Sequence, residues 1–197
     1  MKIVFFIDSK TVNIDKYSIK DIPGSSGRLD VISRCILAAL IGSDNFEKNI
    51  QMWVFLKGYG TFIFNPELFN YVYFPKNELS LTDYFVSFLQ KKFHEDQPLN
   101  PLNKLKVSNK GILEAIKYFQ ELNYKLYILQ EQGIDFFKLL DSIQEQERIV
   151  FIIGSQEDEF LYSEELLALK IPALSFGNQS YLASSVIRLL KLHLIGL

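Results

Sequence analysis

Five consecutive apolar residues, Ile149–Ile153, constrain the fold of this chain more than any other feature. An unbroken apolar run of that length favours a central strand, here over 148–153, that helices cover on both faces. The surrounding sequence alternates between short apolar runs and amphipathic segments. It predicts strands over 125–129 and 173–174 and helices over 108–122, 134–143, 163–170 and 179–194. Such alternation implies βαβ crossovers, and therefore an α/β fold with a mostly parallel sheet flanked by helices.

The N-terminal half shows the same two kinds of segment. Strands are predicted over 2–7, 50–57, 61–65 and 71–74, and helices over 29–41 and 80–94, with Ser108 or Asn109 as N-cap of the later helix 108–122. Residues 8–27 have the composition of a loop, and the prolines and asparagines of 95–107 make the clearest internal break. A chain of 197 residues fits a single domain spanning 1–197.

Composition excludes several classes of protein. Lys and Arg total 21 against 23 Asp and Glu, so any nucleic-acid site must be a local basic patch. The single cysteine, Cys35, allows no internal disulfide and reads as a buried, unreactive thiol in an intracellular protein. His94 and His193 lack a cysteine cluster, so no zinc site is expected. No signal peptide or membrane span is apparent, which favours the cytoplasm.

Parallel sheets bind ligands beyond the carboxyl ends of their strands, which here points to three loops. These are Gln130–Gly133, Gly154–Glu159 and Ser175–Gln179. Gly154 follows a buried strand and allows close approach of a ligand, whereas the acidic residues after it argue against a phosphate. The alternative to a ligand site after Gly154 is a solvated acidic turn. The alternative to a ligand contact at the small residues 183–185 is ordinary helix packing.

Residues Pro23–Asp30 place two glycines around two serines immediately before a helix. This pattern is compatible with an anion-binding turn or with an ordinary loop leading into the helix. The segment lacks the Gly-Lys-Ser/Thr ending of a Walker loop and the Gly-x-Ser-x-Gly spacing of a nucleophile elbow. No Ser/His/Asp, Cys/His or paired-carboxylate arrangement stands out elsewhere in the chain.

Taken together, these segments resemble the TrmY-like tRNA pseudouridine N1-methyltransferases of the SPOUT superfamily, which are related to Nep-type enzymes. The most specific similarity is Ile19–Cys35, which matches a family run of Pro-Gly-Ser-Cys-Gly-Arg-Leu-Asp followed by Arg-Cys. Residues 108–111, 127–129, 151–154 and 174–175 agree in order and spacing. The chain departs from the family at Ser26 and Val186, where cysteine is common, after Gly154, where Asp-His is usual, and at Phe176–Gln179.

The resemblance implies a C-terminal deep trefoil knot over roughly 125–197 that binds S-adenosylmethionine through three loops. The residues expected to hold it are Leu129, Gly133, Gly154, Leu174, Ser175, Leu182 and Val186. It also implies a homodimer whose sites are completed by the partner chain, and a Gly-Ser-Ser-Gly-Arg loop that faces the methyl donor.

The resemblance further implies a tRNA substrate, methylated at N1 of pseudouridine 54. Arg28 is expected to contact the flipped nucleotide or its phosphate, and Asp30 to orient Arg28 or accept the proton. Arg34 and Lys110 are expected to bind the RNA backbone. The alternatives are a SPOUT methyltransferase that acts on another RNA base or on a ribose 2′-hydroxyl, and an inactive relative that only binds RNA.

Overall fold

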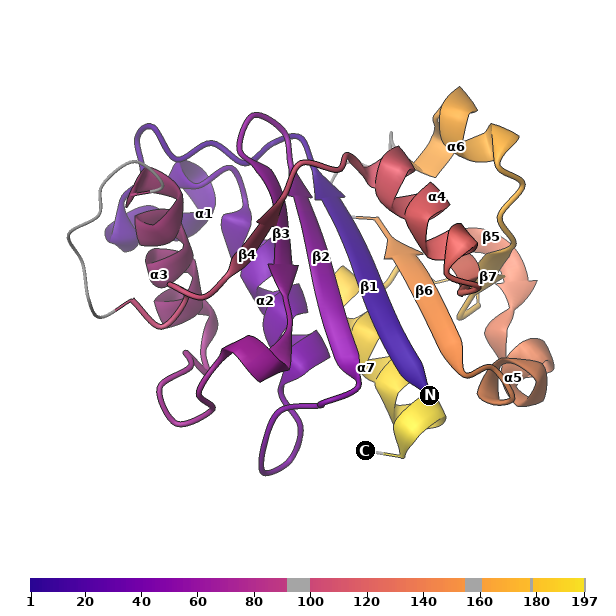
Figure 1. The fold of residues 1–197 in the computed structure, drawn as a ribbon. Helices are drawn as coiled ribbons and strands as arrows, with labels where there is room; N and C mark the ends of the chain where they lie inside the picture. The colour runs from indigo at the N-terminus through magenta and orange to yellow at the C-terminus, as the bar shows by residue number, and fades with distance from the viewer. Residues whose placement is uncertain (92–99, 155–160, 178, 197) are drawn as a thin grey trace.

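The computed structural model describes residues 1–91, 100–154, 161–177 and 179–196, whose strands form one seven-stranded sheet in the order β4-β3-β2-β1-β6-β5-β7 (Figure 1). The strands are β1 (Lys2–Ser9), β2 (Ile50–Leu56), β3 (Gly60–Phe64), β4 (Lys106–Ser108), β5 (Lys125–Asp135), β6 (Arg148–Ile153) and β7 (Ala173–Ser175). The helices are α1 (Ile22–Ser25), α2 (Leu29–Leu40), α3 (Glu78–Lys91), α4 (Ile112–Glu121), α5 (Phe136–Gln144), α6 (Glu164–Ala168) and α7 (Ala183–Ile195). Single 3₁₀ turns lie at Ile19–Asp21 and Pro66–Leu68.

The predicted parallel sheet is confirmed from β2 to β7. β1 pairs in parallel with both β2 and β6, and β5 pairs in parallel with both β6 and β7. The apolar run Ile149–Ile153 lies in β6 between β1 and β5, and none of its residues is more than 4% exposed. The β2–β3 and β3–β4 pairs are antiparallel and extend the sheet at one edge.

Helices cover both faces of the sheet, as the unbroken apolar strands require. One face is packed by α2, α3, α5 and α7, whose buried side chains join the odd-numbered core residues of β1 such as Phe5. The other face is packed by α4 and α6 against the even-numbered residues such as Phe6. Figure 1 shows α7 lying behind the sheet beside α2. Within the described residues, no helix combines the length and apolar character that a membrane crossing needs.

The strand predicted over 71–74 is wrong, because these residues form a turn. Asn70 starts that turn: its side-chain oxygen accepts the Val72 N–H at 2.9 Å, and its carbonyl accepts the Phe74 N–H at 2.9 Å. Val72 and Tyr73 are each 74% exposed, while Phe74 packs into the core. A local side-chain hydrogen bond therefore outweighs the β propensity of the aromatic residues.

Other boundaries also differ from the prediction. β5 continues to Asp135, so the predicted loop 130–133 lies within this strand, and α5 begins at Phe136 rather than at 134. The segment 8–27 is not all loop, since Asp21 accepts the Gly24 N–H at 3.2 Å and caps α1. Ser108 belongs to β4, so α4 begins later, with Gly111 as its N-cap. α7 begins at Ala183 rather than at 179. The predicted residues His94 and 155–159 lie outside the described part of the chain.

Candidate functional site

A pocket lies at the carboxyl ends of β5, β6 and β7, the sheet edge where a ligand is expected. It brings together Leu129, Gly154, Leu174, Ser175 and Val186, five of the seven residues expected to hold the cofactor. Leu129 is 8% exposed and Leu174 is fully buried, so the pocket has an apolar floor. Each of the three predicted loop segments therefore contributes described residues to one hollow: Gln130 and Glu131 from the first, Gly154 from the second and Ser175–Gly177 from the third.

Gly133 lies outside that lining, and its contribution is to the shape of the pocket. Both Leu129 and Ile134 of β5 pair with Leu174 of β7, so the four residues between them bulge out of the strand. A Cβ atom on Gly133 would lie 2.4 Å from the carbonyl carbon of Leu174, closer than any real contact. A glycine is therefore needed for β5 to bulge while remaining against β7.

The hydroxyl of Ser175 ties two of the loops together. Its Oγ donates to the carbonyl oxygen of Glu131 at 2.9 Å and accepts the Gly177 N–H at 3.0 Å. The residue is only 4% exposed. We therefore assign it to positioning of the pocket wall. Leu182, the other predicted residue outside the lining, is 64% exposed and precedes the first turn of α7.

A second group of predicted residues lies where α1 meets α2. Gly27 and Arg28 both adopt left-handed backbone conformations, with φ of 57° and 67°. Thr11 donates its hydroxyl to the Gly27 carbonyl at 3.0 Å, and a Cβ on Gly27 would collide with the Thr11 carbonyl oxygen. The buried Ser26 hydroxyl accepts the Leu29 N–H at 3.1 Å and closes the turn. Such backbone strain at a non-glycine residue is often found at functional sites.

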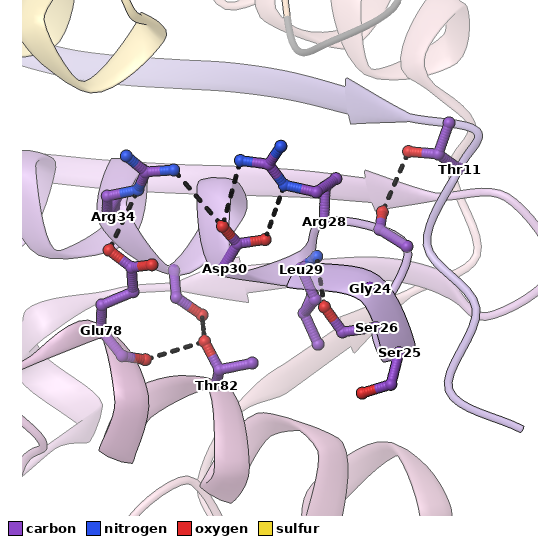
Figure 2. Close-up of polar contacts among 12 residues, drawn as sticks. Thr11, Gly24, Ser25, Ser26, Arg28, Leu29, Asp30, Arg34, Glu78 and Thr82 are labelled. Atoms are coloured by element: carbon purple, nitrogen blue, oxygen red, sulfur yellow. Dashed lines mark hydrogen bonds and ion pairs between the residues drawn. The ribbon is translucent and has the colours of Figure 1, made fainter. Parts of the chain in front are cut away.

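Asp30 joins the two arginines that the sequence places six residues apart (Figure 2). Its carboxylate accepts hydrogen bonds from Arg28 Nε at 3.1 Å and Nη2 at 3.3 Å, and from Arg34 Nη2 at 3.4 Å. The Asp30 side chain is 3% exposed, whereas those of Arg28 and Arg34 are 37% and 31% exposed. Arg34 Nε also lies 3.0 Å from a Glu78 carboxylate oxygen in α3. One buried carboxylate thus fixes two guanidinium groups that both reach solvent.

Comparison with known families identifies the family of this chain. Residues 1–196 match a family model described as "Putative SAM-dependent RNA methyltransferase". The chain belongs to this family.

Curated relatives of this methyltransferase family carry a more specific name. A Pyrococcus abyssi protein named tRNA (pseudouridine(54)-N(1))-methyltransferase is 29% identical over 97% of this chain and 96% of its own length. A protein of the same name from Methanococcoides burtonii is 29% identical over 83% of each chain. The fold resembles that of Archaeoglobus fulgidus Nep1, solved bound to S-adenosylhomocysteine, with a TM-score of 0.65 and 13% identity over 98% of this chain and 97% of that one.

The predictions overlooked two aromatic residues of the pocket in this methyltransferase. Tyr162 and Tyr181 line the pocket, and the predicted helix 179–194 includes Tyr181. Because α7 begins only at Ala183, residues 179–181 lie along the pocket wall. Gln130, within a predicted loop, donates from Nε2 to the Leu161 carbonyl at 3.1 Å across the pocket. The sequence signal for both tyrosines is an aromatic residue in the segment that follows a strand, β6 for Tyr162 and β7 for Tyr181.

Lys110 lines a different cleft from the pocket, and so the structure does not bring it together with the cofactor residues. No described residue of 23–30 lines the pocket either. Cys35 is fully buried in α2, and burial raises the pKa of its thiol to about 12, which agrees with an unreactive cysteine. His193 packs its ring against Phe137 at 5.0 Å. Among the described residues, no cluster of His, Cys, Asp and Glu could hold a metal ion.

Proposed function

We propose that this chain transfers a methyl group from S-adenosylmethionine to N1 of pseudouridine 54 in the T-loop of tRNA. The names of its relatives, one of them aligned over 97% of the chain, support this target. The observation that carries the proposal is the pocket, in which described residues from the bulge of β5 and from the ends of β6 and β7 line one hollow. A tRNA substrate in turn favours action in the cytoplasm.

The pocket lining suits S-adenosylmethionine. Leu129, Phe176 and Val186 offer apolar surface to a flat purine ring. The carboxylate of Glu131 in the lining suits ribose hydroxyls or an ammonium group, both of which are hydrogen-bond donors. When bound, the cofactor supplies an electrophilic methyl group on a positively charged sulfur. Gly133 and Ser175 act indirectly, by holding the bulge of β5 and the residues after β7 in place.

The chain's own residues contribute mainly by orienting the target base. N1 of pseudouridine must lose its proton and lie in line with the methyl group, and orientation supplies most of the acceleration for such a step. The base has to leave its stack to be reached. The partly exposed guanidinium of Arg28 is suited to holding the flipped nucleotide and to stabilising negative charge that develops on the uracil ring.

Asp30 is best suited to orienting these arginines. Both of its oxygens already accept hydrogen bonds from guanidinium groups, and its side chain is 3% exposed. Three of the roughly four lone-pair sites of the carboxylate are therefore occupied, which leaves little room for a substrate proton. Arg34, fixed by Asp30 on one side and Glu78 on the other, is then positioned to contact an RNA phosphate.

The proposed enzyme is a single domain with a C-terminal knot that acts as a homodimer. The knot is supported by the likeness to the Nep1 fold and by the return of the chain after β7 to pack α7 against α2. The dimer is supported by apolar side chains that one copy leaves exposed near the pocket: Ile134 is 51% exposed, Phe137 52% and Leu182 64%. A second copy would cover them and bring its own Arg28 loop to the pocket.

Nucleoside mapping tests the function directly. The purified chain is incubated with S-adenosylmethionine and two tRNA transcripts, identical except for pseudouridine or uridine at position 54. We expect 1-methylpseudouridine at that position in the first transcript and no methylation of the second. A methyl group on another base or on a ribose 2′-hydroxyl would contradict the target. Absence of cofactor binding in calorimetry would contradict methyltransferase activity and leave RNA binding alone.

A further inference from the structure

A second cleft lies at the same sheet edge as the pocket, beyond the carboxyl ends of β1 and β2. It is formed by the segment after β1, the β2–β3 turn and the segment between β4 and α4, which Figure 1 shows close together above β1. Lys10, Lys57 and Lys110 each come from a different one of these segments, and all three are exposed. The cleft is separate from the cofactor pocket.

Hydrogen bonds hold the three lysine-bearing segments in place. The Lys57 backbone N–H donates to the Ser9 carbonyl at 3.0 Å, which joins the end of β2 to the end of β1. The Lys110 carbonyl accepts the hydroxyl of buried Thr61 at 2.7 Å, which joins the segment before α4 to β3. The Lys110 ammonium lies 5.3 Å from the centre of the Tyr118 ring. The backbone frame of the cleft is therefore preorganised.

The charge of the cleft is opposite to that of the whole chain. Three lysines and one carboxylate, Asp8, are the charged side chains among the described residues that line it, for a net charge of +2. The whole chain has a net charge of −2. Burial raises the pKa of Asp8, although Lys10 opposes this shift. The N-terminus of α4 adds little positive potential to the cleft, because the Glu114 carboxylate already accepts the Gly111 N–H at 2.8 Å.

The cleft is also continuous with the Arg28 loop. The hydrogen bond from Thr11 to the Gly27 carbonyl joins the two segments, and Lys10 and Arg28 are the residues next to its two ends. The Tyr59 hydroxyl, on the β2–β3 turn, accepts the Ile14 N–H at 3.1 Å and extends the same connection. The segment that carries Lys10 is therefore held beside the Arg28 loop.

We propose that this cleft binds backbone phosphates of the tRNA substrate, with Lys10 and Lys57 acting together with Lys110. The proposal rests on the proposed function and extends the RNA contact beyond Arg28 and Arg34. Three ammonium groups on a rigid frame suit phosphates without reading the base sequence. A local site of this kind also explains how a chain with a net negative charge binds a polyanion.

The test compares two double variants that remove the same charge from opposite edges of the sheet. Lys10→Gln with Lys57→Gln alters the cleft, whereas Lys2→Gln with Lys48→Gln alters exposed lysines at the amino ends of β1 and β2. Affinity for tRNA is measured from 50 to 200 mM salt. The cleft variant should reduce the slope of log affinity against log salt by roughly 1.4 to 1.8, for two lost phosphate contacts. The control should keep the wild-type slope, and both should bind S-adenosylmethionine normally.

A wild-type slope in the cleft variant, or an equal loss in the control, would overturn the proposal. Lys57→Arg serves as a rescue variant, because it keeps the charge and should keep the slope. The two proposals fail differently. Wild-type protein that binds tRNA with the expected slope but does not methylate it would contradict the proposed function alone. Wild-type protein that methylates tRNA while the cleft variant keeps its salt slope would contradict the cleft alone.

Discussion

At the scale of single residues, Arg28 carries the most specific chemical expectation. Replacing Arg28 by Ala should abolish methyl transfer, because the guanidinium that holds the target nucleotide is lost. Cofactor affinity should stay nearly unchanged, since Arg28 does not line the pocket. Single-turnover assays and calorimetry measure the two effects separately. A parallel loss of cofactor binding would contradict the assignment of Arg28 to the nucleotide.

The amide variant of Asp30 distinguishes two roles for this residue, orienting the arginines and accepting the substrate proton. Asp30→Asn keeps the shape but weakens the charged hydrogen bonds to Arg28 and Arg34, each of which contributes about 1.5 to 3 kcal/mol. We expect kcat/KM for tRNA to fall about tenfold to a hundredfold, while the dependence of the rate on pH keeps its shape. Loss of the acidic limb of the pH profile, where the rate rises as a general base loses its proton, would instead identify Asp30 as the proton acceptor.

Cys35 provides a residue-scale test of packing. Its side chain is fully buried and burial raises the pKa of its thiol to about 12, so the reactive thiolate is scarce at neutral pH. We expect an aromatic disulfide reagent to leave the native protein unmodified and to label one thiol per chain in denaturant, since the sequence holds a single cysteine. Rapid labelling of the native protein would show that α2 does not pack as described.

At the scale of elements, sequence periodicity predicts the helices and strands that form from a local sequence pattern. The amphipathic spacing of Leu29, Ile32, Ile36 and Ala39 predicts α2, and the apolar run Ile149–Ile153 predicts β6. The failures lie where one hydrogen bond or one long-range pairing decides. Asn70 folds 71–74 into a turn, and β4 exists because Val107 pairs with Phe62 on a distant strand. No local window of sequence contains that second interaction.

The bulge in β5 makes a further prediction at this scale. Gly133→Ala should destabilise the fold by about 1 to 3 kcal/mol, because the added methyl group meets the backbone of Leu174 rather than a movable side chain. Cofactor affinity should fall with it, since the bulge shapes the pocket. Gly111→Ala is the matched control: its nearest neighbour would lie 3.8 Å away, so the cost should stay below about 1 kcal/mol. Equal effects on unfolding and on cofactor affinity in both variants would contradict this account.

At the scale of the whole molecule, the sheet decides which charges lie together. Arg28 and Arg34 are close in sequence, so a local cluster of the two can be expected. The sequence does not predict that Asp30 joins the two side chains. Lys10, Lys57 and Lys110 are far apart along the chain and meet only because β1, β2 and the start of α4 share one edge. A net charge of −2 therefore says little about RNA binding, because binding depends on where the lysines gather.

The packing of α7 on α2 makes the stability of the whole molecule depend on pH through Lys191. This side chain is 2% exposed, and its ammonium donates to the carbonyl oxygens of Ala38 at 2.9 Å and Ile41 at 2.7 Å, at the end of α2. Burial lowers the pKa of Lys191 from 10.5 to about 8; Glu47 opposes the shift and Arg188 adds to it. Between these two pH values the unfolded chain holds the proton that the folded chain has lost.

Stability should therefore rise, relative to a variant without the amine, as pH increases from about 8 to 10.5. The comparison is between wild type and Lys191→Met in urea unfolding at several pH values, so that the titration of other groups cancels. The difference in free energy of unfolding should be constant below pH 8 and should then change in favour of the wild type by about 3 kcal/mol. The neutral amine still donates to both carbonyl groups, so the gain comes from no longer burying a charge. A difference that falls with pH would mean that the two carbonyls stabilise the ammonium more than burial destabilises it.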